Sequence, residues 1–201
     1  MNNEECIILY GGSFDPPHIG HMIVAQWVAE ALSGTVRFLP AGNPPHKDNV
    51  GSGAHRLKML EIATAGNPSF LVDDYEYNLG KVNYTVDTLE RYSREYNVSR
   101  EKLFFVIGSD SLRDFDTWRD PQGIANQATL LAFAREGVNW KELLLSLKHL
   151  GAKIIICKAP IIQVSSTLVR ARVRQGLRVD YLVPSGVDKY IAQMGLYQEG
   201  I

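Results

Sequence analysis

The feature that most restricts the fold of this chain is an alternation of short apolar runs with longer segments of helical periodicity. The runs rich in β-branched and aromatic residues are 5–10, 35–40, 69–74, 102–108, 129–135 and 153–160. Between them, segments such as 21–34, 54–66, 85–96 and 139–151 repeat apolar residues at helical spacing. Strand–helix–strand connections are right-handed and place helices on both faces of a parallel sheet. The pattern therefore predicts an α/β fold with a doubly wound, mostly parallel sheet.

The size of the chain suits one compact domain. Its 201 residues, 45% of them hydrophobic, can bury one substantial core, and no repeat or linker divides them. From Ser165 onward the pattern becomes wholly helical, and Val187, Ile191 and Met194 share one helical face. We expect a single domain over residues 1–201, in which residues 165–201 form a helical C-terminal subregion that caps the sheet.

The charge and the cysteines limit the class of partner and the compartment. The chain has 21 Lys and Arg residues against 22 Asp and Glu, so its charge is nearly balanced. It therefore lacks the overall positive charge that would indicate a nucleic-acid partner. Neither a signal-peptide pattern nor a membrane-length apolar run is present, which predicts a cytoplasmic protein without a membrane partner. Cys6 and Cys157 lie far apart in apolar runs without metal-ligand spacing, so we expect buried free thiols.

The segment GGSFDPPHIGH, residues 11–21, joins the first predicted strand to the first predicted helix. Ligands of doubly wound sheets lie at this kind of connection, where the free N–H groups of a helix start face a phosphate. Gly11 and Gly12 allow the backbone to approach a ligand closely. The dinucleotide-binding pattern Gly-x-Gly-x-x-Gly and the Walker pattern Gly-x-x-x-x-Gly-Lys-Ser/Thr are both absent from this segment. His18 and His21, three residues apart, would point the same way and could donate to phosphate oxygens.

Two other interpretations of this segment remain open. Pro16 and Pro17 could simply form a tight turn, with the histidines as surface or capping residues. A zinc site is less favoured, because Asp15 is the only nearby carboxylate and the spacing differs from that of zinc proteases. The coincidence of strand, turn and helix start favours a phosphate site, and we assign no metal-ligating residue.

GGSFDPPHIGH resembles the phosphate signature of the nucleotidyltransferase superfamily, and VSSTLVR, residues 164–170, resembles the motif that closes the triphosphate site in bacterial adenylyltransferases. Further segments resemble the nicotinate-nucleotide adenylyltransferases in the same order along the chain: 39–47, 55–63, 83–89, 105–118 and 183–197. The resemblance implies a Rossmann-like nucleotidyltransferase fold. It also implies that the adenylyl group of ATP is transferred to nicotinate mononucleotide, which gives nicotinate adenine dinucleotide and pyrophosphate in NAD biosynthesis.

The resemblance implies an ATP site built mainly from two helix starts. Imidazole and guanidinium donors there would neutralise the leaving pyrophosphate, with His18, His21 and Arg170 as the catalytic residues. The expected ATP-binding residues are Gly11, Gly12, Ser13, His18, His21, Gly108, Asp110, Ser165, Ser166, Thr167 and Arg170. Taken alone, the serines and Asp110 could be ordinary helix caps, and Arg170 could lie on a solvated face with Arg172 and Arg174.

A second group of residues is expected to bind the pyridine nucleotide. Trp118 offers a face for ring stacking, and a helix start at Tyr84 and Thr85 offers N–H donors that favour a carboxylate over a carboxamide. The expected nicotinate mononucleotide site comprises Phe14, His46, Lys47, Tyr84, Thr85 and Trp118. Core packing of Trp118 and solvation of Lys47 are the alternatives. Residues 134–137 depart from the family pattern, so Arg135 receives no ligand role.

ATP chemistry of this type implies Mg²⁺, held by water and phosphate oxygens rather than by a protein cage. A homo-oligomer is compatible with the sequence. The alternative functions are a sister adenylyltransferase, acting on nicotinamide mononucleotide or phosphopantetheine, and a nucleotide-binding regulator without turnover. The NYTVDTL and DTW segments oppose the first alternative, and His18, His21 and Arg170 oppose the second.

Overall fold

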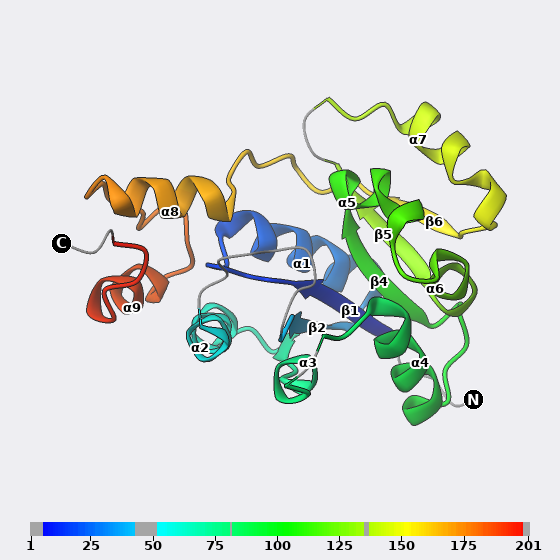
Figure 1. Ribbon diagram of the computed structural model, residues 1–201, viewed down its shortest axis with the longest axis horizontal. Helices are drawn as coiled ribbons and strands as arrows, with labels where there is room; N and C mark the ends of the chain where they lie inside the picture. The colour runs from blue at the N-terminus through cyan, green and yellow to red at the C-terminus, as the bar shows by residue number, and fades with distance from the viewer. Residues whose placement is uncertain (1–5, 43–51, 81, 135–136, 199–201) are drawn as a thin grey trace.

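The computed structural model describes residues 6–42, 52–80, 82–134 and 137–198. Within these ranges six strands form one all-parallel sheet in the order β3-β2-β1-β4-β5-β6 (Figure 1). The strands are β1 (Ile7–Gly12), β2 (Thr35–Pro40), β3 (Phe70–Val72), β4 (Leu103–Gly108), β5 (Thr129–Phe133) and β6 (Ile154–Cys157). The order reverses between β1 and β4, which creates a crevice at their carboxyl ends. The predicted α/β, doubly wound, Rossmann-like fold is confirmed.

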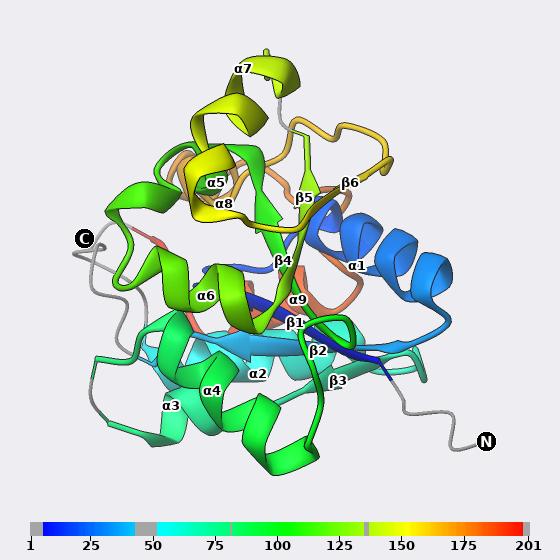
Figure 2. The same ribbon diagram turned by 90° about the vertical axis from the view of Figure 1, so that its right-hand side faces the viewer.

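Helices cover both faces of this sheet (Figure 2). α1 (Ile19–Leu32) and α2 (Gly53–Thr64) pack on one face, and α4 (Thr85–Tyr96), α6 (Pro121–Gln127) and α7 (Trp140–Ser146) pack on the other. Side chains alternate along β1, so that Ile8 and Tyr10 join the core under α1 while Ile7 and Leu9 join the core under α4. Both faces are therefore apolar, as the near-continuous hydrophobic strands require.

Several short helices lie outside the predicted pattern. They are α3 (Tyr75–Asn78), α5 (Ser109–Arg113) and α6, besides a single 3-10 turn at Phe115–Thr117. Segments of four to seven residues complete too few turns to show helical periodicity. α6 depends instead on its start, where the Asp120 side chain accepts from the Gly123 N–H (2.9 Å) and Pro121 opens the helix.

The C-terminal region differs from the prediction of a wholly helical segment. It contains two helices, α8 (Ser166–Arg174) and α9 (Val187–Gln193), separated by turns at residues 175–186. Gly176 takes a φ of +69° and Pro184 lacks an N–H donor, so neither residue suits a continuous helix. Val187 and Ile191 are buried, but Met194 is 45% exposed because α9 ends before it.

These two helices cap α2 rather than the sheet. Val169 of α8 and Ile191 of α9 join a separate apolar cluster with Met59 of α2. Figure 1 shows α9 beside α2, and α8 above the start of α1. This arrangement places the start of α8 next to the start of α1, although the two lie far apart in the sequence.

The cysteines are free, as expected, but both are half-buried rather than fully buried. Burial raises the pKa of the Cys157 thiol. Among the described helices, none combines the length and apolar composition needed to cross a bilayer.

Candidate active site

Three adjoining cavities form a continuous cleft at the carboxyl ends of β1 and β4. The central cavity, about 570 Å³ in volume, is lined by the β1–α1 connection, the end of β4 and the start of α8. On one side lies the Ile161 cavity (about 290 Å³), which shares Tyr10, His21 and Asp110 with the central cavity. On the other lies the Trp118 cavity (about 250 Å³), which shares Gly12 and Trp118 with it.

The structure brings the sequence-predicted ATP residues together. Those that line the central cavity are Gly11, Gly12, Ser13, His18, His21, Gly108, Asp110, Ser165, Ser166, Thr167 and Arg170. They come from the ends of β1 and β4 and from the starts of α1, α5 and α8, which meet at the carboxyl edge of the sheet. The two distant helix starts therefore face one cavity.

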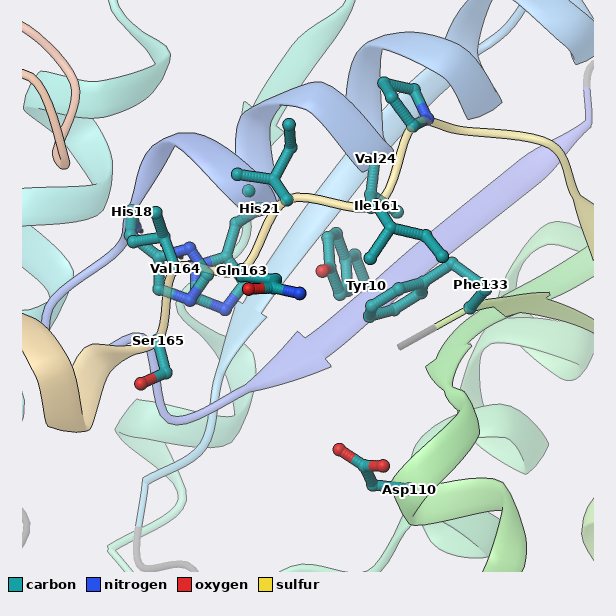
Figure 3. A pocket seen from close by; sticks show the side chains of 14 residues that line it. Tyr10, His18, His21, Val24, Asp110, Phe133, Ile161, Gln163, Val164 and Ser165 are labelled. Atoms are coloured by element: carbon teal, nitrogen blue, oxygen red, sulfur yellow. Dashed lines mark hydrogen bonds between the residues drawn. The ribbon is translucent and has the colours of Figure 1, made fainter. Parts of the chain in front are cut away.

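The two histidines stack at the start of α1. His18 is the N-cap residue, and its ring centroid lies 3.6 Å from that of His21 with an interplanar angle of 27°. The His18 backbone N–H donates to Nδ1 of His21 (3.1 Å). Because Nδ1 accepts, the imidazole proton of His21 lies on Nε2, which becomes a donor. Figure 3 shows both rings at the cavity wall beside Gln163, with Asp110 across the opening.

Side chains from two other helices hold the carbonyl groups of the β1–α1 loop, residues 13–18. Arg56 of α2 donates from Nη1 to the Ser13 carbonyl (2.9 Å) and from Nη2 to the Gly42 carbonyl (3.1 Å). Ser166 Oγ donates to the Pro16 carbonyl (2.9 Å), and Arg170 Nη1 donates to the Asp15 carbonyl (2.6 Å). The loop is thereby fixed before any ligand binds, which lowers the cost of ordering it on binding.

Arg170 does not share a solvated face with Arg172 and Arg174. It is half-buried, lines the central cavity and places Nη2 3.4 Å from Thr167 Oγ1. Ser165 combines the two roles considered for it, that of a helix cap and that of a residue at the ATP cavity. Its hydroxyl accepts from the Leu168 N–H (3.1 Å) as an ordinary N-cap, and the residue also lines the central cavity.

Three of the residues predicted to bind nicotinate mononucleotide line the Trp118 cavity at the start of α4. Tyr84 is the N-cap of α4, Thr85 is its first residue, and both lie in the wall of this cavity with Trp118. Trp118 also packs on Phe115, with ring centroids 5.6 Å apart, so it serves the core as well as the cavity. Arg119, which the sequence did not single out, lies over the Tyr84 ring at 4.5 Å.

Comparison with known proteins places these features in a family. The cytidylyltransferase-like family model matches residues 9–172. A curated protein of Thermomicrobium roseum, named "Probable nicotinate-nucleotide adenylyltransferase", is 40% identical over 94% of this chain and 90% of its own length. A protein of Borreliella burgdorferi with the same name is 37% identical over 95% of this chain and 96% of its own. This chain belongs to the nicotinate-nucleotide adenylyltransferase family.

A solved structure supports the fold of this family member. The Plasmodium falciparum nicotinic acid mononucleotide adenylyltransferase, complexed with NaAD, superposes with a TM-score of 0.79 at 18% identity and covers 96% of this chain and 97% of its own. A structure from Vibrio parahaemolyticus, titled a putative nicotinate-nucleotide adenylyltransferase, superposes with a TM-score of 0.69 at 22% identity, covering 98% of this chain and 97% of its own. At these identities the likeness concerns the fold.

Phe14, an expected contact of nicotinate mononucleotide, packs against the histidine pair. It is 2% exposed, with a φ of +47°, and its ring packs edge-on against His21, with centroids 5.0 Å apart. Phe14 lines the central cavity, whereas the described lining of the Trp118 cavity does not include it. Its contact supports the His21 ring. His46, Lys47 and Arg135 lie outside the described residues.

Arg56 is a residue of the site whose part sequence reasoning missed. This guanidinium is 2% exposed, although arginine in a helix usually faces solvent. Burial lowers the pKa of Arg56, and the neighbouring Asp15 acts in the opposite direction. One signal was present: Arg56 lies three and four residues before the buried Met59 and Leu60, so it shares the apolar face of α2.

Glu76 of α3 is a second residue that sequence reasoning missed. It lines the Trp118 cavity, and its Oε1 accepts from the Thr88 hydroxyl (2.7 Å), which accepts in turn from Asn83 Nδ2 (2.6 Å). Burial raises the pKa of Glu76, and the negative charge of Asp73 raises it further. The hydrogen bonds from Thr88 and Asn83 act in the opposite direction and lower this pKa. This network ties α3 to the first turn of α4.

The raised pKa of Glu76 predicts a pH-dependent effect of Glu76→Gln on stability. Above the ordinary carboxyl pKa of 4.5, Glu76 stays protonated in the folded protein but is ionised in the unfolded chain. The free energy of unfolding of the wild type therefore falls as the pH rises from 4.5 through the raised pKa of Glu76. Gln cannot titrate, so the melting temperature of the variant should rise relative to wild type between about pH 4 and pH 7. Thermal melts across this range measure the difference.

The matched control for this prediction is Glu90→Gln, a change of the same kind at an exposed position of α4. We expect the difference in melting temperature between this control and wild type to stay constant across the same pH range. A constant difference for Glu76→Gln as well would contradict the pKa assignment.

Proposed function

We propose that this chain transfers the adenylyl group of ATP to nicotinate mononucleotide and releases nicotinate adenine dinucleotide and pyrophosphate, as a step of NAD biosynthesis. The observation that carries the proposal is the meeting of two helix starts, with His18, His21 and Arg170, at one cavity that an aromatic cavity adjoins. The names of the curated relatives and the complex of the Plasmodium enzyme support it.

The reaction needs positioning and charge neutralisation rather than a general base. The 5′-phosphate of nicotinate mononucleotide, already an anion, attacks the α-phosphorus of ATP; the new P–O bond forms as the bond to the β-phosphate oxygen breaks. Charge develops on the leaving pyrophosphate. Nε2–H of His21, the start of α1 and the Arg170 guanidinium are the donors for that charge, and Ser165, Ser166 and Thr167 add the start of α8.

The flanking cavities suit the two nucleoside halves. The Ile161 cavity receives adenosine between Tyr10, Phe133 and the 160–165 segment, with Gly108 and Asp110 at its junction with the phosphates. Asp110 is placed to accept from a ribose hydroxyl. The Trp118 cavity receives the pyridine, stacked on Trp118, with its carboxylate directed at the start of α4. His46 and Lys47 remain proposed contacts of the mononucleotide.

A divalent cation, which we propose to be Mg²⁺, enters with ATP. No group of three His, Cys, Asp or Glu side chains within the described ranges could hold a metal ion. We propose that phosphate oxygens and water, rather than protein side chains, hold this cation. When bound, the cation adds positive charge at the triphosphate. We place the enzyme in the cytoplasm, with ATP and nicotinate mononucleotide rather than nucleic acid or membrane as its partners, and a homo-oligomer remains compatible with it.

Turnover with two mononucleotides tests the proposal. Purified protein is incubated with Mg·ATP and either nicotinate or nicotinamide mononucleotide, and both pyrophosphate and dinucleotide are quantified. A charge-assisted contact to the nicotinate carboxylate predicts a kcat/KM preference of about tenfold or more over the amide. Equal efficiency would reject the carboxylate site, and ATP binding without pyrophosphate release would favour a regulator.

A further inference from the structure

The segment after α9 returns to the β1–α1 loop. α9 ends at Gln193, Gly195 takes a φ of +60°, and the Leu196 N–H donates to the Ile191 carbonyl (3.0 Å). The half-buried Tyr197 then donates its hydroxyl to Oδ1 of Asp15 (2.6 Å). The contact joins two residues 182 positions apart.

Asp15 is an unusual residue for the wall of a phosphate cavity. Its side chain is 3% exposed and lines the central cavity, where an acidic group would repel a triphosphate. A carboxylate at this depth requires hydrogen bonds and a positive neighbour. Tyr197 supplies a hydrogen bond, and the positive charge of Arg56 interacts electrostatically with Asp15.

The Tyr197 hydroxyl keeps its proton in this setting. Burial and then the Asp15 carboxylate raise the pKa of Tyr197, while Arg170 and Arg56 oppose them. The Tyr197 hydroxyl therefore stays protonated and remains a hydrogen-bond donor. Asp15 is consequently held at two points, since its carbonyl accepts from Arg170 Nη1 (2.6 Å) and its carboxylate accepts from Tyr197.

We propose that Tyr197 is a positioning residue for ATP: by holding the Asp15 carboxylate, its hydroxyl sets the position of the β1–α1 loop and of Arg170. The inference rests on the proposed function. Tyr197 is not among the described residues that line the central cavity, so it acts through Asp15 rather than by touching the nucleotide.

Tyr197→Phe tests the proposal, because it removes the hydroxyl and keeps the ring. A shift of the loop and of Arg170 should raise the KM for ATP roughly tenfold and leave the KM for nicotinate mononucleotide near its wild-type value. The matched control is Tyr190→Phe on α9, whose hydroxyl bonds with His55 Nδ1 (2.9 Å) and not with the loop. The control should keep both KM values.

Two results would overturn the inference. One is a Tyr197→Phe enzyme with the wild-type KM for ATP. The other is a variant that loses melting temperature and active fraction but keeps both KM values, since that pattern describes structural support alone. A wild-type protein without turnover would contradict the proposed function instead. In that case the wild type and Tyr197→Phe are compared by their Kd for a non-hydrolysable ATP analogue. An unchanged Kd in Tyr197→Phe would then overturn the inference.

A double-mutant cycle with Asp15→Ala shows whether the hydroxyl acts through Asp15. In the Asp15→Ala background, Tyr197→Phe should have no further effect on the KM for ATP. Fully additive effects would contradict the proposed route. Should Asp15→Ala fail to fold, the comparison of Tyr197→Phe with Tyr190→Phe decides alone.

Discussion

His21→Ala should lower kcat by about 10²- to 10³-fold, because it removes a fixed donor aimed at charge that develops on the phosphates. The folded structure should persist, since the α1 N-cap residue His18 and the packed face of α1 remain. Pyrophosphate release at saturating ATP and nicotinate mononucleotide measures kcat, and circular dichroism confirms the fold. The ATP KM should change less than kcat, because the interaction strengthens in the transition state.

The control for this experiment is His149→Ala. His149 is 60% exposed and lies by Asp116, outside the described linings of the three cavities. It should leave kcat unchanged. Near-normal turnover of His21→Ala would remove His21 from the phosphate machinery and leave the imidazole pair with a capping role alone.

Arg56→Ala should lower the free energy of unfolding by about 3 kcal/mol, since it strips a charged donor from two carbonyl groups and leaves a void in the core. The carbonyls of Ser13 and Gly42 would lose their partner. Asp15 would also lose a positive neighbour, which adds to the cost of its burial. Urea denaturation measures the change, and kcat/KM for ATP should fall with it because the β1–α1 loop is no longer held.

Lys58→Ala on the same helix is the matched control. Lys58 is 54% exposed and pairs with Glu61 at 3.0 Å, so its loss should change stability by less than about 1 kcal/mol. If Arg56→Ala unfolded at the same urea concentration as this control, the buried guanidinium would contribute nothing to the loop and its described hydrogen bonds would be without energetic consequence.

Local pattern determined the fold class and the histidine pair. A strand–helix alternation encodes a parallel sheet, because each crossover obeys the same handedness wherever it occurs. His18 and His21 meet because three residues at a helix start bring two side chains to one side, which depends only on backbone geometry. The ligand-binding edge follows as well, since loops at the carboxyl ends of parallel strands share one edge.

Local pattern failed where periodicity was short or interrupted. α3 and α6 are too brief to show a period, and the C-terminal region carries Gly176 and Pro184 inside an otherwise helical pattern. The sequence pattern also did not predict the packing of the Phe14 ring against His21.

Only the tertiary structure decided how the site is supported. Arg170 reaches the Asp15 carbonyl across 155 positions, Tyr197 reaches the Asp15 carboxylate across 182, and Arg56 reaches Ser13 across 43. Together these contacts bring α2, α8 and the end of the chain to the same loop, and the apolar cluster around Met59 packs these segments on one another. Hydrophobic periodicity states which face of a helix is buried, but the partner of that face depends on the packing of the whole chain.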